Sequence, residues 1–284
     1  MKNKTGISAF STVILPKNGW FDIHLNEVWR YRDLIKLFVK RNFISQYKQT
    51  ILGPAWALIQ PLLTTVVFTV VFGSLAGLAA DGVPSFLFFM SGNIAWGYFS
   101  SCLTATANTF TGNSAIFGKV YFPRLVSPIS TVLTNLISFS IQFVLFLVFM
   151  VIYWIKGDVR PSLYALMLPL LLVHMAMLSL GVGIIISSLT TKYRDLKMLV
   201  SFGVQLWMYG TPVAYDIGII PPKYMSLYML NPMTPIINAF RTAFLGLGRF
   251  DLPHYLLSWL VTIVVLFFGL MLFSRVEKTF MDTV

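Results

Sequence analysis

Long stretches of this chain contain no charged residue, and this pattern restricts its possible folds more than any motif does. Seven windows lack Asp, Glu, Lys and Arg altogether: residues 49–80, 82–118, 125–155, 161–191, 198–215, 224–240 and 252–274. A helix that spans a membrane needs about 20 consecutive apolar residues, and six of the windows reach or approach that length. Only 11% of the 284 residues are charged, against about 25% in an ordinary soluble domain. The sequence therefore predicts an all-α polytopic membrane protein.

Six transmembrane helices are expected, at about residues 53–75, 86–110, 128–155, 162–189, 198–214 and 254–274. The remaining window contains two prolines within four positions, and proline removes a backbone hydrogen-bond donor. We expect residues 221–246, PPKYMSLYMLNPMTPIINAFRTAFLG, to form two half-helices that dip into the membrane from outside and return before the last span. Such a break is tolerated where protein or a water-filled cavity surrounds it. A seventh span is the alternative.

The distribution of lysine and arginine predicts the orientation. With six spans and both termini in the cytoplasm, 16 of the 21 Lys and Arg residues fall on the cytoplasmic side, as the positive-inside rule requires. The net charge of +11 does not indicate nucleic acid, because the basic residues lie between apolar segments rather than in one run. Residues 1–48 are mixed and polar, so we expect no cleavable signal peptide.

The polar start of the chain is expected to contain two parts. Residues 1–26 form a cytoplasmic extension, and residues 27–49 form an amphipathic helix ahead of the transmembrane domain, which occupies 50–284. An apolar stripe at helical spacing consists of Tyr31, Leu34, Ile35 and Phe38. A helix lying on the inner leaflet fits, because acidic lipids attract its basic face. The alternative is a soluble helix packed on a partner subunit.

The usual signatures of catalysis and of an independent energy source are missing. The chain has no G-x-x-x-x-G-K-[ST], HExxH, CxxC or GxSxG pattern. His174 and Cys102 are expected to be packed core residues, and Gly181 and Gly183 to permit close helix packing. We therefore expect no enzyme, no metal site and no cofactor in this chain. Any uphill transport must draw its energy from another polypeptide.

A short basic segment separates the second and third expected spans. It reads TGNSAIFGKVYFPRLVSP (111–128) and is amphipathic, with prolines that limit a helix on its far side. A helix at about 111–124 could insert its apolar residues into a groove on a soluble subunit. The alternative is an ordinary positive-inside loop with an aromatic anchor.

Several phrases resemble a known family. KVYFPRLVSPIS (119–130) closely resembles the cytoplasmic loop of the type-2 ABC transporter permeases that export bacterial polysaccharides. Four further segments resemble other parts of these permeases, in the same order: RDLIKLFVKRNFISQYKQTILGPAWALIQPL (32–62), TTKYRDLK (190–197), WMYGTPVAY (207–215) and LNPMTPIINAFR (230–241). The resemblance runs from about residue 28 to the end of the chain.

The resemblance implies a homodimeric permease with two copies of a separate ABC ATP-binding subunit, which binds ATP and Mg. It implies ATPase-coupling roles for Gly118, Lys119, Tyr121, Phe122, Pro123 and Arg124, with Gly118 to Arg124 helical, and a second contact at Lys192, Tyr193, Arg194 and Asp195. It implies a channel lined from spans one and five, by Trp56, Phe68, Phe72, Trp207, Met208 and Tyr209. It implies an external gate built from Pro221, Pro222, Asn231, Pro232, Met233 and Pro235.

The expected function is export of a lipid-linked polysaccharide, such as O antigen or a capsule-type polymer, across the bacterial inner membrane. Aromatic rings suit such a path because they pack on the C–H faces of sugars, although aromatic residues also anchor membrane interfaces. Teichoic-acid export, drug or small-lipid export, and an uncoupled scaffold subunit are the alternatives.

Overall fold

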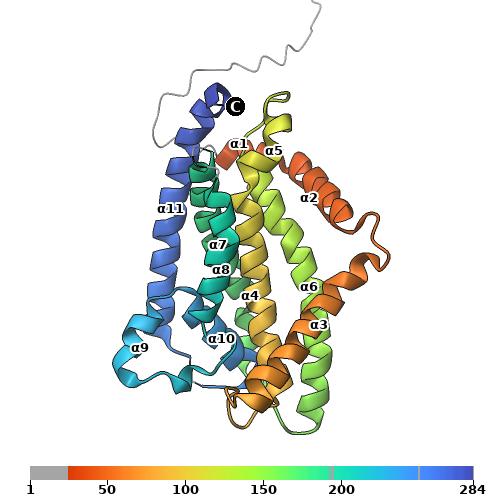
Figure 1. Ribbon diagram of the computed structural model, residues 1–284, viewed down its shortest axis with the longest axis vertical. Helices are drawn as coiled ribbons and strands as arrows, with labels where there is room; N and C mark the ends of the chain where they lie inside the picture. Colours follow the sequence, from red (N-terminus) through yellow and green to blue (C-terminus); the bar gives the residue numbers. More distant parts are fainter. Residues whose placement is uncertain (1–24, 192, 194, 249, 284) are drawn as a thin grey trace, which may run out of the picture.

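The computed structural model describes residues 25–191, 193, 195–248 and 250–283, and within these residues the regular elements are all helices (Figure 1). Long helices run along the long axis and short helices lie at both ends. We call the end that carries α1 (Leu25–Arg30) and α5 (Thr109–Phe117) the upper end. The lower end carries α9 (Pro222–Met229) and α10 (Met233–Leu245).

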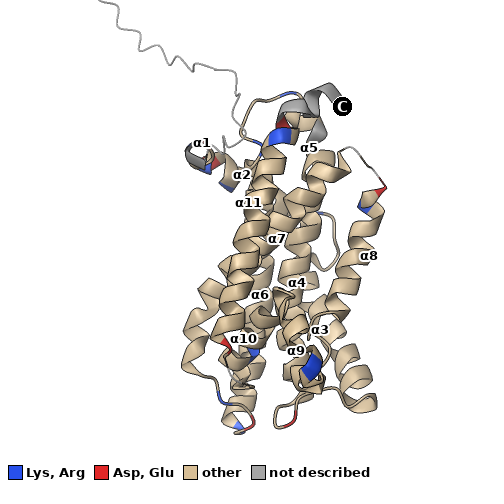
Figure 2. Ribbon diagram, turned by 90° about the vertical axis from the view of Figure 1, so that its left-hand side faces the viewer, with Lys and Arg blue, Asp and Glu red and all other residues tan. Residues whose placement is uncertain are grey.

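Helices lie in all six ranges in which spans were expected. They are α3 (Trp56–Phe68, flanked by η1, Gly53–Ala55, and η2, Thr69–Leu75), α4 (Ser85–Ala107), α6 (Val126–Ile155), α7 (Leu168–Thr190, preceded by η3, Leu163–Met167), α8 (Leu196–Tyr209) and α11 (Leu252–Thr283). Four described segments are long and apolar enough to cross a membrane: Gly53–Leu75, Val126–Ile155, Leu163–Thr190 and Leu252–Glu277. Charged residues lie toward the two ends of the bundle and leave its middle free (Figure 2). The prediction of an all-helical, multi-pass membrane protein is confirmed.

The helix α4 occupies the centre of the bundle. It packs against α3, α6, α7, α8 and α10, and most of its residues are buried. Its 23 residues extend over about 34 Å, which is enough to cross a bilayer. It is less apolar than the four segments above, because it carries Ser, Thr and Asn side chains, of which Ser91 and Thr106 are buried.

The helix α8 ends earlier than expected. The fifth span was predicted to reach residue 214, but the helix stops at Tyr209 after 14 residues. Gly210 is a poor helix former, and Pro212 both lacks an N–H and disfavours a helical conformation at Thr211. Residues 211–214 therefore form a buried turn between α8 and the short η4 (Ile217–Ile219).

Two glycines of α7 allow close contacts with neighbouring helices. A Cβ on Gly181 would lie 2.9 Å from the Cα of Leu266 in α11, and one on Gly183 would lie 2.6 Å from the Cβ of Thr106 in α4. Any larger side chain would force these helices apart. The prediction that these glycines permit close packing is confirmed.

His174 and Cys102 lie inside the bundle, as expected of core residues. Both side chains are buried. The Nε2 atom of His174 lies 2.9 Å from the hydroxyl of Thr262, and its ring stacks on Trp259 with the centroids 4.2 Å apart. The histidine thus links α7 to α11.

The N-terminal amphipathic segment forms two helices, α1 and α2 (Arg32–Tyr47), separated by a turn at Tyr31. Its apolar stripe packs against the protein itself. Phe38 belongs to a buried group that we call the upper cluster: Val28, Phe38, Phe110, Phe117, Phe122, Val126, Ile184 and Phe273. The basic side chains Arg32, Lys36, Lys40 and Arg41 are exposed on the remaining faces of α2.

Candidate functional site

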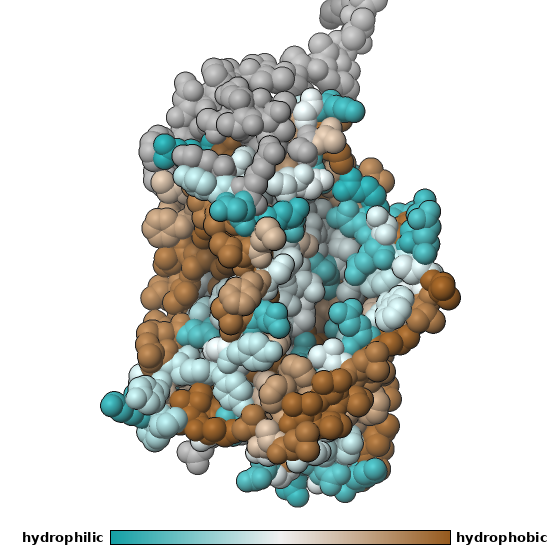
Figure 3. All heavy atoms as spheres, in the orientation of Figure 1, coloured by the Kyte–Doolittle hydropathy of each residue, from teal (hydrophilic) through white to brown (hydrophobic). Residues whose placement is uncertain are grey.

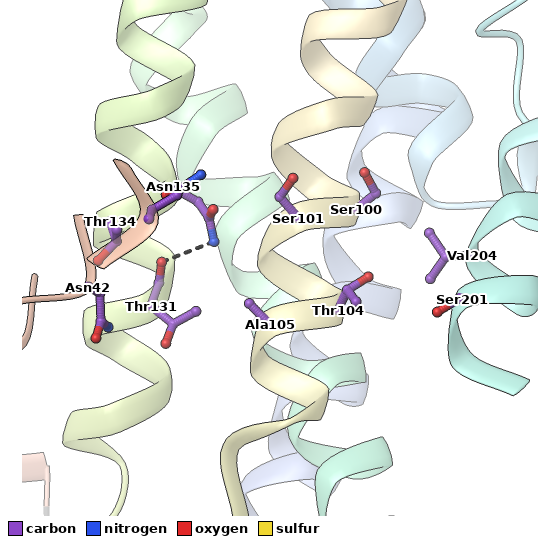
Figure 4. A pocket seen from close by; sticks show the side chains of 11 residues that line it. Asn42, Ser100, Ser101, Thr104, Ala105, Thr131, Thr134, Asn135, Ser201 and Val204 are labelled. Atoms are coloured by element: carbon purple, nitrogen blue, oxygen red, sulfur yellow. Dashed lines mark hydrogen bonds between the residues drawn. The ribbon is translucent and has the colours of Figure 1, made fainter. Parts of the chain in front are cut away.

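A cavity of about 660 Å³ opens between α2, α4, α6 and α8 and contains no charged residue in its wall (Figures 3 and 4). Its wall is formed by Asn42, Gln46, Ser100, Ser101, Thr104, Ala105, Thr131, Thr134, Asn135, Ser201 and Val204. Figure 4 shows the side chains of α6 on one side and those of α8 on the other, with α4 between them. In Figure 3 pale and teal residues lie at the middle of this face, bordered by brown apolar residues.

A second cavity of about 270 Å³ adjoins the first, because Gln46, Ser101 and Asn135 line both. It extends toward α3 and adds further uncharged residues, among them Trp56, Gln60, Thr64, Asn93, Trp96, Ser138, Gln142 and Met208. We call the two cavities together the polar groove. Its wall combines hydroxyls, amides and a few large apolar or aromatic side chains.

The groove offers many weak hydrogen-bonding groups and no fixed charge. Several of its side chains already donate to carbonyls of their own helix, as Thr131 does to Ser127 O (3.1 Å) and Thr134 to Ser130 O (2.8 Å). A hydroxyl that donates to the backbone can still accept a hydrogen bond. Such a surface suits a solute rich in hydroxyl groups, because no ion pair would trap it.

Two of the six predicted channel-lining residues, Trp56 and Met208, lie in the wall of the polar groove. Phe68 and Phe72 pack on each other with ring centroids 5.0 Å apart, and Phe68 also contacts Phe89 of α4. These two phenylalanines lie outside the groove.

Trp207 and Tyr209 also lie outside the groove, near the lower end of α8. The ring of Trp207 packs against Trp96 and Phe99 of α4, with centroids 6.3 and 5.1 Å away. Tyr209 is exposed. A channel role for these residues, as for Phe68 and Phe72, stays a prediction.

The hydroxyl and amide residues of the groove were missed by sequence reasoning, although the sequence carries a signal for them. On α6 they recur at Thr131, Thr134, Asn135, Ser138 and Gln142, which is the spacing of one helix face. Uncharged polar residues that share a face within a charge-free window indicate a side that avoids lipid.

The predicted coupling helix is wrong in its second half. We expected a helix over about 111–124, with Gly118 to Arg124 helical, but α5 ends at Phe117 and residues 118–124 form turns and bends. Gly118 is a poor helix former, and Pro123 disfavours a helical conformation at the residue before it. We call residues 118–124 the upper loop.

The upper loop has an exposed tip and a buried root. Lys119, Val120 and Tyr121 are exposed, with Tyr121 at 63% of its maximum. Phe122 is buried in the upper cluster, where its ring centroid lies 5.5 Å from that of Phe38 and 5.7 Å from that of Phe117. Phe122 therefore packs the upper loop against α2.

Arg124, predicted to contact the ATPase, is half-buried against α11 in the structure. Its Nη1 donates to the backbone carbonyl of Glu277 at 2.6 Å. Burial lowers the pKa of the Arg124 guanidinium, and the nearby Glu277 carboxylate partly offsets that shift. This hydrogen bond joins the upper loop to α11.

The second predicted contact lies only partly in the described residues. Lys192 and Arg194 fall outside them. Tyr193 and Asp195 are exposed at the upper end, and the carboxylate of Asp195 accepts a hydrogen bond from the backbone N–H of Leu196 at 3.1 Å. Asp195 thereby caps the start of α8.

The predicted gate residues form the α9–α10 pair at the lower end. Pro221 and Pro222 stand at the start of α9, and Asn231 and Pro232 form the turn that leads into α10, which begins at Met233 and contains Pro235. The side chain of Asn231 is held by α8: its Nδ2 donates to Gly210 O (2.9 Å), and its Oδ1 accepts from Trp207 Nε1 (2.9 Å).

In the described part of the chain, no three His, Cys, Asp or Glu side chains lie close enough together to hold a metal ion.

Comparison with known proteins gives one family and several relatives. The model of the ABC-2 type transporter family matches residues 33–245. The chain is 27% identical over 252 residues to the O-antigen export system permease protein RfbA of Klebsiella pneumoniae, covering 88% of this chain and 94% of that protein. It is 26% identical over 265 residues to the O-antigen export system permease protein RfbA of Myxococcus xanthus, covering 92% of this chain and 98% of that protein. It is 22% identical over 251 residues to the polysialic acid transport protein KpsM of Escherichia coli, covering 86% of this chain and 93% of that protein.

Proposed function

The chain belongs to the ABC-2 type transporter family, and from that premise we propose that it is the permease subunit of an exporter of lipid-linked polysaccharide. The cargo is of O-antigen or capsule type and crosses the bacterial inner membrane. The names of the relatives, which refer to O antigen and to polysialic acid, support this cargo class.

The observation that carries the proposal is the polar groove. A polymer of sugars presents many hydroxyls, which exchange hydrogen bonds with Ser, Thr, Asn and Gln side chains at little net cost. Because no charged residue lines the groove, successive sugars can leave as easily as they enter. A permease for apolar drugs or small lipids would need a mainly apolar pocket instead.

The proposed topology has six spans, with the upper end and both termini in the cytoplasm. The bias of lysine and arginine supports this orientation, and the length of α4 supports its being a span despite its polar residues. The α9–α10 pair then lies at the external side. Almost all of α10 is buried among neighbouring helices, which is the environment that a re-entrant helix requires.

The energy comes from a separate ABC ATPase that binds the upper end, with ATP and Mg held by that subunit. The exposed tip of the upper loop and exposed Tyr193 and Asp195 supply a surface for it. The permease itself is a homodimer in this proposal. Only 11% of the apolar window in Gly53–Leu75 is buried, and α8 has no buried residue, so a second copy has two exposed helices to cover.

Reconstitution tests the proposal. The permease and its ATPase are inserted into vesicles with a polyprenol-linked polysaccharide on the ATPase side, and sugar that becomes protected from added glycosidase is measured. We expect ATP-dependent protection, together with faster ATP hydrolysis when cargo is present. ATP hydrolysis that is unchanged by polysaccharide but stimulated by a drug or a small lipid would refute the cargo class. ATP hydrolysis without movement of polysaccharide would favour an uncoupled scaffold subunit.

A further inference from the structure

We infer that Arg241 is a positioning residue that fastens α10 to the lower end of α8, so that the two elements move as one body during transport. The inference rests on the proposed function, because it assigns a mechanical role within the same permease.

Arg241 is a buried cation that bonds to one turn of the backbone. Its side chain is 3% exposed. Nη1 donates to the carbonyl oxygens of Pro212 (2.6 Å) and Tyr215 (3.3 Å), and Nη2 donates to that of Val213 (2.9 Å). These carbonyls belong to the turn that follows α8. The guanidinium therefore supplies donors that this non-helical, buried backbone would otherwise lack.

The other face of the guanidinium rests on α4. Its central carbon lies 3.7 Å from the centroid of the Phe88 ring, a cation–π contact. Gly92 leaves the necessary room, because a Cβ there would lie 2.8 Å from Nη2 of Arg241 and 2.9 Å from the carbonyl oxygen of Val213. The Phe88 ring, Gly92 and the turn after α8 together hold the guanidinium of Arg241 in one position.

Asn231 makes a second connection between the same two elements. In addition to its bonds to Gly210 and Trp207, its Nδ2 donates to the hydroxyl of Thr211 at 2.9 Å. Arg241 lies within α10 and Asn231 lies just before it, so they bind the end of α8 from two points. Two separated attachments oppose rotation of α10 relative to α8, whereas a single one would act as a pivot.

A purely packing role would not require arginine. Burying a guanidinium is costly unless it is hydrogen-bonded, and Nε of Arg241 is buried without a partner. An apolar side chain would fill the space more cheaply. Only a guanidinium carries several N–H donors in fixed directions in one plane. These donors fix the orientation of the turn after α8. Any opening at the lower end then occurs at the edges of the α8–α10 body and not between its parts.

Distance measurements on the assembled permease–ATPase complex test this inference. Spin labels are placed at Leu206 of α8 and Leu230 just before α10, which are 54% and 53% exposed, in one permease copy only. The single native cysteine is removed by Cys102→Ser. We expect the same narrow distance distribution without nucleotide and with ADP–vanadate trapped. A wild-type distribution that shifts between the two states by more than its own width would overturn the inference.

Variants of Arg241 give the functional readout. Arg241→Gln should broaden the distance distribution and reduce export about tenfold or more, because misplaced elements lose their geometry, while complex assembly and basal ATP hydrolysis persist. Arg241→Lys, which keeps the charge but not the fork, should restore export only in part. Wild-type export and distances with Arg241→Gln would contradict the assignment.

Gly92→Ala is the second variant, and it perturbs the guanidinium without removing it; it should also broaden the distribution. If the Arg241→Gln complex does not assemble, the distance distributions of the Gly92→Ala complex and of the wild-type complex still test the inference. Failure of the wild-type complex to move polysaccharide would reject the proposed function and would leave the distance test valid.

Discussion

Reversing the charge at two positions of the upper loop separates a docking role from a structural one. Lys119 is exposed at the tip, whereas Arg124 is half-buried and donates to the carbonyl of Glu277 at 2.6 Å. If the tip binds the ATPase, Lys119→Glu should weaken binding of that subunit and leave the permease as stable as before. Arg124→Glu should instead lower the stability of the permease.

The magnitudes follow from the two environments. An exposed ion pair contributes about 0.2–1 kcal/mol, and reversing one charge replaces attraction by repulsion of similar size, so Lys119→Glu should reduce affinity about 2- to 30-fold. Raising the salt concentration should shrink that difference. Arg124→Glu removes a charge-assisted hydrogen bond that contributes about 1.5–3 kcal/mol and brings its new carboxylate close to that of Glu277.

The assay measures ATPase affinity and the unfolding temperature of each purified variant. Lys119→Glu should lower the affinity for the ATPase, and Arg124→Glu should lower the unfolding temperature. Any loss of affinity in Arg124→Glu should follow from its loss of stability. An Arg124→Glu protein that unfolds at the wild-type temperature but no longer binds ATPase would show that Arg124 docks the ATPase and is not structural. A Lys119→Glu protein of unchanged affinity at low salt would contradict docking by the tip.

Three further changes have defined outcomes. Phe122→Ala leaves a cavity in the upper cluster and should lower the free energy of unfolding by about 3–5 kcal/mol, measured by denaturant titration. Val120→Ala at the exposed tip should leave it almost unchanged, and equal effects of the two changes would argue against the burial of Phe122. Gly183→Val should destabilise the bundle by about 1–3 kcal/mol or more through overpacking, while Gly203→Ala, with no atom within 4 Å of the new Cβ, serves as its control in thermal unfolding. Asn135→Leu makes the groove less polar and should slow polysaccharide export in vesicles without loss of assembly; export at the wild-type rate would count against the groove.

The helical framework was predictable from the sequence because it depends on local composition. Charge-free windows of sufficient length located the helices, and small residues such as Gly181 and Gly183 indicated close packing before any contact was known. The ends of helices were less predictable. Both α5 and α8 stop at a glycine that precedes a proline by a few residues, and the apolar pattern continues past that point.

Contacts between distant parts of the chain were not predictable. Arg124 resembled a docking residue in sequence, but its partner, Glu277, lies 153 positions away on α11. Arg241 ends the segment 230–241 that resembled the family, but nothing nearby in sequence shows that its guanidinium meets the turn after α8. The polar face of α6 was visible in the sequence, but the groove as a whole was not predictable, since its wall combines α2, α3, α4, α6 and α8.

Photo-cross-linking during turnover tests whether polysaccharide passes along the polar groove. A photoreactive amino acid is introduced at Ser101, which lines both cavities, and at Leu133, an exposed apolar position of α6, as the matched control. We expect ATP-dependent cross-links to polysaccharide from Ser101 and cross-links only to lipid from Leu133. Polysaccharide captured at Leu133, or never captured at Ser101 in a complex that exports it, would contradict passage along the polar groove.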